Sequence, residues 1–327
     1  MTAPAQAPLI FLKVVADIRS KPAALLFDAG PGDVPALAPL FEDEAFQSLA
    51  TFPRLYPAST DPVLAEQLQA AGWTAVAPGE VFDPGQTFDP AVVPAGVRWV
   101  GGDWCLSAPP RLGAAQAASR ALALQLVQCV ASDADNHEIE ALLRRDPALS
   151  YHLLRLVNSL GMGATRKITS FSQALLILGR SQLRRWLNLM LFAARDGDPR
   201  SAMLLARVAV RGRAIELLAR AAGLDRTTQE QGFMTGMFSL LGTLFGMPLP
   251  EVLAPLSIGE AVHAALLDHD GELGALLLAI EQAERGEFDR VSAHLAALQV
   301  SHQEFNQAMA EASVFMLGAV RESSASA

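Results

Sequence analysis

The chain has 327 residues, of which 51% are hydrophobic and 18% are charged. That length predicts two domains, and that composition provides enough apolar surface for a buried core. The net charge of −9 argues against a general nucleic-acid binder, because such proteins usually carry a basic overall charge. The two cysteines, Cys105 and Cys129, show neither disulfide nor metal-ligand spacing, which fits a reducing cytoplasm and argues against a disulfide-stabilised fold.

Charge is unevenly distributed along the sequence. Residues 141–226 contain 15 Lys and Arg and 5 Asp and Glu, a net charge of +10. The remaining residues contain 10 and 29, a net charge of −19. This asymmetry predicts either an anionic partner for the basic segment or two domains that attract each other.

Two segments bear on cellular location. Met1–Pro4 has no basic or apolar signal-peptide region, so we expect a cytoplasmic protein. Gln231–Pro250 is uncharged for 20 residues, which is long enough to span a bilayer. Glycines, prolines and hydroxyl side chains interrupt it, and we therefore expect a buried core helix and no membrane insertion.

Residues 1–110 alternate between short strand-like and helix-like segments, which predicts a small α/β domain with a parallel sheet. The expected strands are Ala23–Phe27, Arg54–Tyr56, Thr74–Ala77 and Val97–Val100, and the expected helices are Val34–Ala50 and Pro62–Ala71. The second helix has the clearer boundaries, with Asp61 as the N-cap, Pro62 at the first position and Gly72 after the end. Residues 79–96 are rich in Pro and Gly and predict a long loop.

From about residue 114 the sequence predicts helices only, so the fold class is α+β overall, with an all-α domain over residues 114–321. Capping-box patterns predict helix starts at Ser170, Thr227, Ser257 and Ser301, and Asp-Pro pairs predict starts at Asp146 and Asp198. Gly179, Gly223 and Gly271 are expected helix stops. Residues 322–327 form a short polar tail that we expect to be disordered.

Three segments of this helical region, Asp146–Ser159, Ile168–Gly179 and Leu183–Leu187, resemble the signature of the HDOD family. The resemblance runs from about residue 120 to 320. It implies a bacterial all-helical domain related to the HD phosphohydrolases. Gly236–Gly242 and Met247–Leu253 resemble the subgroup in which the HDOD domain follows an EAL-type domain, the barrel of cyclic di-GMP phosphodiesterases.

That resemblance implies that the first half descends from an EAL barrel. Arg54–Ala77 is similar to the middle of such a barrel, and Gly101–Pro109 is similar to its last turn. About 105 residues are too few for a (β/α)₈ barrel of roughly 250. The first domain is therefore either a truncated, degenerate remnant or a different fold.

Metal-dependent phosphohydrolases of the HD type need His and Asp ligands that hold metal ions and activate water. The family frame Gly-x-x-His-Asp-x-Gly reads here with Ser239 and Leu240 in place of His and Asp, and Ala206–Arg213 lacks an earlier His. His269-Asp270 lies outside this frame, at an expected helix end, and Glu140–Leu142 spells an EAL motif by chance. We expect no catalytic residue, no bound metal and no cofactor.

Basic residues near the signature form the candidate surface for a partner or an anion: Arg166, Lys167, Arg180, Arg184 and Arg185. We expect them to face outward, either toward the acidic first domain or toward a partner. The sequence therefore predicts a non-catalytic bacterial signalling regulator or scaffold that acts through contacts with signalling proteins. The alternatives are a residual metal-dependent phosphohydrolase and a nucleotide or nucleic-acid binding module that uses the basic helices, although nucleic acid and cyclic dinucleotides are not the expected ligands.

Overall fold

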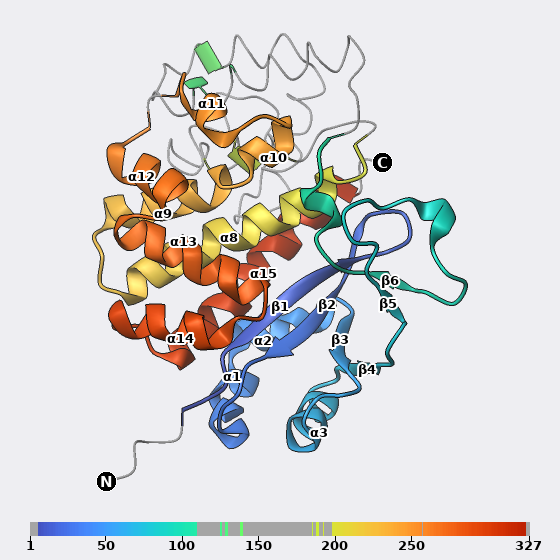
Figure 1. Cartoon of the computed structure of the whole chain (residues 1–327). Coiled ribbons are helices and arrows are strands. Elements are labelled where there is room, and N and C mark those ends of the chain that lie inside the picture. Colours follow the sequence, from blue (N-terminus) through green and yellow to red (C-terminus); the bar gives the residue numbers. More distant parts are fainter. Residues whose placement is uncertain are drawn as a thin grey trace, which may run out of the picture.

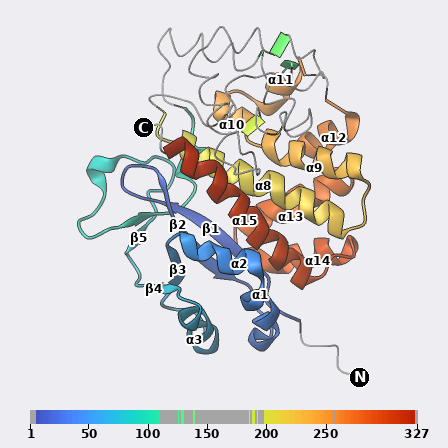
Figure 2. The same ribbon diagram turned by 180° about the vertical axis from the view of Figure 1, so that it is seen from behind.

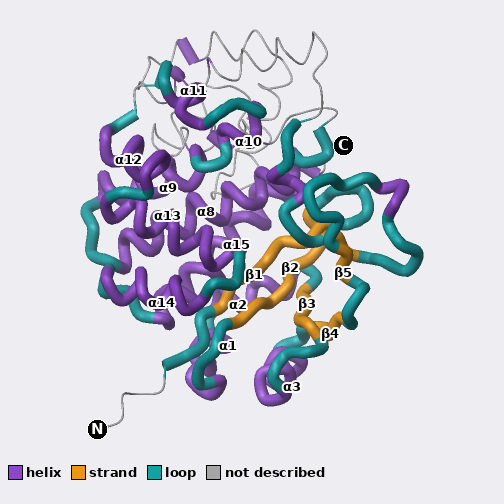
Figure 3. Tube along the Cα trace, in the orientation of Figure 1, coloured by secondary structure: helices purple, strands orange, loops and turns teal. Residues whose placement is uncertain are grey.

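The computed structural model places a β-sheet built from the first hundred residues beside a group of helices built from the last 130 (Figure 1). It describes residues 6–109, 198–256 and 258–324, together with Gln125, Gln128, Cys129, Glu138, Ile139, Arg185, Asn188, Leu189 and Phe192. Within the described residues, the strands form a small patch and helices make up most of the rest (Figure 3). The expected α+β class is confirmed at this level.

The sheet has six strands in the order β4-β3-β2-β1-β6-β5. Their bounds are Ile10–Ala16 for β1, Pro22–Ala29 for β2, Arg54–Pro57 for β3, Thr74–Val76 for β4, Val81–Phe82 for β5 and Trp99–Val100 for β6. The pairs β2–β3 and β3–β4 are parallel, as expected, and the pair β5–β6 is also parallel, although β5 lies in the expected loop. However, β1 runs antiparallel to both β2 and β6, so the expectation of a parallel sheet was wrong at the centre of the sheet.

Strand β1 was missed, because the first expected strand began at Ala23 and none was expected over Ile10–Ala16. A tight turn from Asp17 to Lys21 joins β1 to β2, and Ser20 adopts a positive φ of 65° in it. Asp17 holds this turn, since its carboxylate accepts hydrogen bonds from the N–H groups of Arg19 and Lys21. A connection this short can join only antiparallel strands.

The first-half helices agree with the sequence where a cap marks them. Helix α3, Pro62–Ala70, begins where Asp61 accepts hydrogen bonds from the N–H groups of Val63 and Leu64. The expected single helix over residues 34–50 is instead broken into η1 (Val34–Leu37), α1 (Ala38–Glu42), α2 (Glu44–Ser48) and η2 (Leu49–Thr51). Asp43 causes the main break, because its backbone is extended while its side chain caps α2. The expected loop 79–96 also contains β5 and η3 (Pro90–Val92).

The described helices of the second part are α8 to α15. Their bounds are Ser201–Ala221 (α8), Arg226–Phe238 (α9), Leu241–Phe245 (α10), Leu249–Leu253 (α11), Glu260–Asp268 (α12), Gly271–Glu284 (α13), Phe288–Ala297 (α14) and His302–Ser324 (α15). Seen from behind, α15 and α2 lie over β1 and β2 (Figure 2). Helix α15 therefore joins the sheet to the other helices.

Helix boundaries test the expected starts and stops. The Ser301 capping box is confirmed, because Ser301 N–H donates to Glu304 and Glu304 N–H donates to Ser301 Oγ. Gly223 ends α8 at a φ of 74°, also as expected. Three expectations are corrected: Asp225 caps α9 in place of Thr227, α8 starts three residues after Asp198, and His269, rather than Gly271, is the left-handed residue that ends α12.

Other expectations change at the chain's apolar stretch and tail. Residues 231–250 form parts of α9, α10 and α11 rather than one core helix, and their large apolar side chains are mostly buried. Among the described residues, no helix is both long and apolar enough to cross a membrane. Helix α15 continues to Ser324, so the first three residues of the expected disordered tail are helical. The starts at Asp146, Ser170 and Ser257 and the stop at Gly179 lie outside the described residues.

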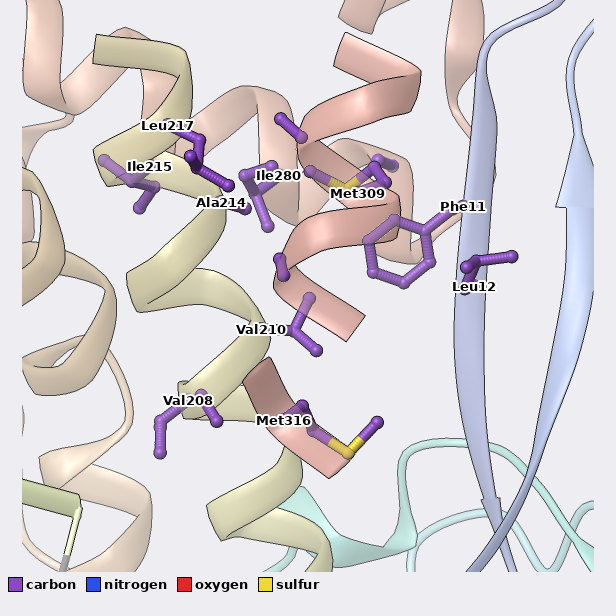
Figure 4. Close-up of a cluster of buried hydrophobic side chains, with 14 of the residues drawn as sticks. Phe11, Leu12, Val208, Val210, Ala214, Ile215, Leu217, Ile280, Met309 and Met316 are labelled. Carbon is purple, nitrogen blue, oxygen red and sulfur yellow. The ribbon is translucent and has the colours of Figure 1, made fainter. Parts of the chain in front are cut away.

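One apolar cluster contains buried side chains from both the sheet and the helices. Figure 4 shows the Phe11 ring of β1 reaching toward Met309 of α15, with Val210 of α8 nearby. The boundary that we expected at residues 110–114 lies outside the described residues. Within the described part, the sheet packs on the helices as a continuous core rather than through a separate interface.

Candidate functional site

Two arginines on α8 carry the most unusual chemistry of the described structure. Arg207 and Arg211 are four residues apart and therefore lie on one face of the helix. Most residues of α8 are buried, and the Arg211 side chain is only 5% exposed. A charge at such a position is stable only when it is paired and hydrogen-bonded.

Arg211 finds its partners on α13. Its Nε and Nη2 atoms donate to the two carboxylate oxygens of Glu284, at 2.8 Å each, in a bidentate pair. Its Nη1 atom donates to Glu281 at 3.0 Å. Arg207 lies beside the same Glu284, at 3.8 Å, and also binds the Asp103 carboxylate and the carbonyl of Gly102. The result is a continuous ionic network from the Gly101–Asp103 turn into the helices.

Ser239, which the resemblance aligns with the His of the Gly-x-x-His-Asp-x-Gly frame, belongs to this network. Arg211 Nη1 donates to Ser239 Oγ at 2.9 Å, and Ser239 donates to the carbonyl of Gly236 at 2.7 Å. Helices α8 and α9 approach closely here, since a Cβ on Gly236 would lie 2.4 Å from the backbone nitrogen of Gly212. Leu240, at the Asp position, is buried in the apolar cluster.

His269 forms the outer end of the network. It ends α12 in the left-handed conformation with a φ of 53°, and its Nε2 atom lies 3.0 Å from Glu281 Oε2. The helix-end location expected for His269 is confirmed. Its contact with Glu281 was not foreseen.

Mutual pairing keeps the network charged. Burial lowers the pKa of Arg211, but the carboxylates of Glu284 and Glu281 outweigh burial and hold that pKa above its ordinary value. Burial raises the pKa of Glu284, but Arg211 and Arg207 outweigh it, and the net direction is downward. Burial lowers the pKa of Arg207 too, but Cys105, Glu284 and Asp103 outweigh it, and the net direction is upward. These groups are therefore ionised at neutral pH.

A cleft of about 600 Å³ lies beside Arg207, between β1, the Gly101–Asp103 turn and the start of the 83–86 loop. We call it the β1 cleft. Phe11 to Val15 form its strand wall, and Val210 and Glu284 belong to its helical wall. Its charged lining residues are Lys13, Asp83, Asp103, Arg207 and Glu284. A volume of this size is within the range of sites that hold small molecules.

Of the basic surface expected from the sequence, only Arg185 lies among the described residues, and its expected orientation was wrong. Its side chain is 15% exposed, forms an ion pair with Glu216 of α8 and stacks over the Phe233 ring at 4.6 Å. Local apolar patterning could not reveal this, because both partners come from later helices. Arg166, Lys167, Arg180 and Arg184 lie outside the described residues, as do Glu140–Leu142.

The basic segment does reach the acidic first half, through different arginines. Arg207 binds Asp103, and Arg200 donates to the carbonyl of Ser107 while Asp198 holds its guanidinium. Sequence reasoning missed Arg207, Arg211, Glu281 and Glu284 as functional candidates. The sequence did show one charged pair spaced by four residues and one spaced by three, each among apolar side chains on its helix.

Comparison with known proteins supports the resemblance over part of the chain. Residues 118–257 match the HDOD domain. The chain is 31% identical over 192 residues to the cyclic di-GMP phosphodiesterase CdgJ of Vibrio cholerae, a match that covers 58% of this chain and 44% of CdgJ. It is 30% identical over 152 residues to the uncharacterized protein YuxH of Bacillus subtilis, covering 46% of this chain and 37% of YuxH. The matches thus span less than half the length of either relative.

Among solved structures, a Shewanella amazonensis SB2B protein named "Putative phosphohydrolase" matches with a TM-score of 0.43 and 14% identity. That match covers 64% of this chain and 98% of the other.

Proposed function

From the HDOD domain at residues 118–257 we propose that this chain is a bacterial signalling regulator that acts through protein–protein contacts and does not hydrolyse phosphoesters. One observation carries the proposal: the guanidinium of Arg211 binds Ser239, the residue at the His position of the metal-binding frame. If this alignment with the frame holds, a permanent cation would take the place of the metal ion that catalysis requires.

The chemistry of the neighbouring donors supports this reading. The carboxylates of Glu281 and Glu284 lie beside this position, and both are hydrogen-bonded to Arg211. A guanidinium does not lose its proton in proteins, so it repels a metal cation at any physiological pH. Leu240 offers no ligand atom, and in the described part of the chain no cluster of three or more His, Cys, Asp or Glu residues is arranged to hold a metal.

The test is a metal and activity measurement on the full chain. After incubation with Mn²⁺, Fe²⁺ or Zn²⁺ and removal of free metal, elemental analysis should find far less than one ion per chain. Cyclic di-GMP and bis(p-nitrophenyl) phosphate should show no turnover, with an active HD phosphohydrolase assayed in parallel. Stoichiometric metal, with turnover that survives repurification and disappears in Glu281→Gln, would overturn the proposal.

The first half fits a related proposal, that residues 6–109 derive from a truncated EAL-type barrel. Strands β2, β3 and β4 are parallel neighbours in chain order, and β5 and β6 form a second parallel pair. Six short strands leave a sheet with open edges where a complete barrel needs eight strands and roughly 250 residues. Isothermal titration calorimetry with cyclic di-GMP should therefore show no binding. Micromolar binding that maps to residues 6–109 would contradict the proposal that these residues are a non-functional remnant of the barrel.

A further inference from the structure

The proposed function requires a surface that binds a partner protein. We propose that the β1 cleft is a docking site for an extended, basic peptide segment of a partner protein, which adds to the open edge of β1 as an extra strand. This inference rests on the proposed function, because it names the surface through which regulation would act.

The first observation is the direction of the β1 backbone groups. In an antiparallel pair, alternate residues direct both their N–H and C=O groups at the neighbour. Gly30 N–H donates to the carbonyl of Leu9, so residues 9, 11, 13 and 15 form the hydrogen-bonded positions with β2. Ile10 N–H confirms this alternation, since it points away from β2 and donates to Asn306. Leu12 and Val14 therefore direct their N–H and C=O groups away from β2.

The second observation is that this outer edge is hydrogen-bonded at both ends and unpaired between them, with its accessible part at Val14, which is half-buried, since Leu12 is only 2% exposed. At one end the side-chain amide of Asn306 binds Ile10 N–H at 2.9 Å and the Pro8 carbonyl at 2.8 Å. At the other end Ala16 pairs with Val100 of β6, the single pair that joins these strands. Within the described residues, no hydrogen bond outside the β1–β2 ladder involves the main chain of Leu12 or Val14.

The third observation explains the opening. Strand β6 would continue along β1 if residues 101–103 stayed extended. Gly102 instead adopts a φ of 79°, and the chain turns toward α8, where Asp103 binds Arg207. The β1 cleft begins at this divergence, and an incoming strand would occupy the path that β6 leaves. Unpaired strand edges recognise extended segments through main-chain hydrogen bonds.

The charge of the first half and of the β1 cleft indicates that the incoming peptide segment is basic. Residues 6–109 contain 5 Lys and Arg and 12 Asp and Glu, a net charge of −7. In the β1 cleft, Lys13 is neutralised by Asp28 and Arg207 by Asp103 and Glu284. Asp83 differs, because its carboxylate accepts a hydrogen bond from Gly85 N–H but forms no ion pair among the described residues. A lysine or arginine of the incoming segment would complete this site.

The experiment uses the full chain and a fluorescent, capped pentapeptide of alternating valine and lysine. We expect saturable binding by anisotropy and slower hydrogen exchange in the segment Leu9–Asp17. Two peptides N-methylated on opposite alternate residues form matched controls, because only one set of amides can face β1. One should lose about tenfold or more in affinity, the equivalent of about one hydrogen bond, and the other should bind normally. A valine–glutamate peptide should bind more weakly.

Two protein variants complete the test. Val14→Pro removes the outward N–H while preserving the bonds of β1 to β2, and it should weaken peptide binding. Asp83→Asn, on a partly exposed loop, should weaken it severalfold and reduce its salt dependence, even if Val14→Pro does not fold.

Equal binding of all peptides, protection outside Leu9–Asp17, or no binding would overturn the inference. So would a dimer that the peptide dissociates, since a second copy would then occupy the edge. None of these results would produce metal-dependent turnover, so failure here stays distinct from failure of the proposed function.

Discussion

The guanidinium of Arg211 binds the carboxylate of Glu284 through two parallel hydrogen bonds of 2.8 Å each, inside the contact between α8 and α13. Both side chains are largely removed from water. Each ion is therefore stabilised mainly by the other, and the pair should behave as one unit when either member is removed.

Arg211→Ala should lower the free energy of unfolding by about 3–5 kcal/mol, because it removes the bidentate partner of the buried Glu284 and leaves that carboxylate with the more distant Arg207, at 3.8 Å. Chemical denaturation measures this loss. Arg213→Ala is the matched control on the same helix. Arg213 pairs with Glu216 and Glu311 nearer the surface, so its loss should cost less than about 1 kcal/mol. The double variant Arg211→Ala with Glu284→Ala should cost less than the sum of the singles, and simple additivity would argue against the pair acting as a unit.

Stability should depend on pH through Glu284. Its pKa lies below its ordinary value of 4.5, because Arg211 and Arg207 outweigh the effect of burial. A carboxyl group with a depressed pKa contributes stability above the unfolded pKa, and this contribution is lost as pH falls through the folded pKa. We therefore expect the free energy of unfolding to decrease below about pH 4.5. Glu284→Gln should reduce this pH dependence of the free energy of unfolding, measured by denaturation at pH 3 to 7. An unchanged pH dependence would mean that other carboxyl groups cause the decrease.

Arg185 should act as a structural residue rather than as a partner contact. It lies over Phe233 and pairs with Glu216, so Arg185→Ala should cost about 1–3 kcal/mol in denaturation experiments. Arg226→Ala is the control, since that side chain is 88% exposed and pairs within its own helix. Its cost should be below about 0.5 kcal/mol. Equal stability of the two variants would instead support the expectation from the sequence that Arg185 faces outward.

The elements that the sequence could predict are those whose cause is local. Asp61 caps α3 and Ser301 with Glu304 caps α15, because each cap needs only residues within three or four positions. The antiparallel β1 was missed although its apolar run is visible. Its place between β2 and β6 depends on pairing with Val100, more than 80 residues away.

The candidate site shows the same limit. The spacing of Arg207 and Arg211 places them on one helix face, and the spacing of Glu281 and Glu284 does the same on another. Nothing local tells that these two faces meet, because about 70 residues separate Arg211 from its partners. The substitution of Ser239 for His could be read from the sequence, whereas the guanidinium bound to it could not.

The close approach of α8 and α9 gives the last prediction. Gly236 lies in the frame that contains Ser239, and a Cβ at this position would lie 2.4 Å from the backbone nitrogen of Gly212. Backbone atoms cannot move aside as a flexible side chain can. Gly236→Ala should therefore force the helices apart and strain the bond between Ser239 and Arg211.

Gly232→Ala is the matched control, since it lies one turn earlier on the same helix and gains the same helix propensity. Its Cβ would meet the side-chain Cγ2 atom of Ile215 at 3.0 Å, a contact that a small rotation can relieve. We expect the free energy of unfolding of Gly236→Ala to be at least about 1 kcal/mol lower than that of Gly232→Ala, because overpacking typically costs about 1–3 kcal/mol. Equal denaturation midpoints would mean that α8 and α9 separate at no cost, and that the position of Ser239 beside Arg211 does not depend on the glycine.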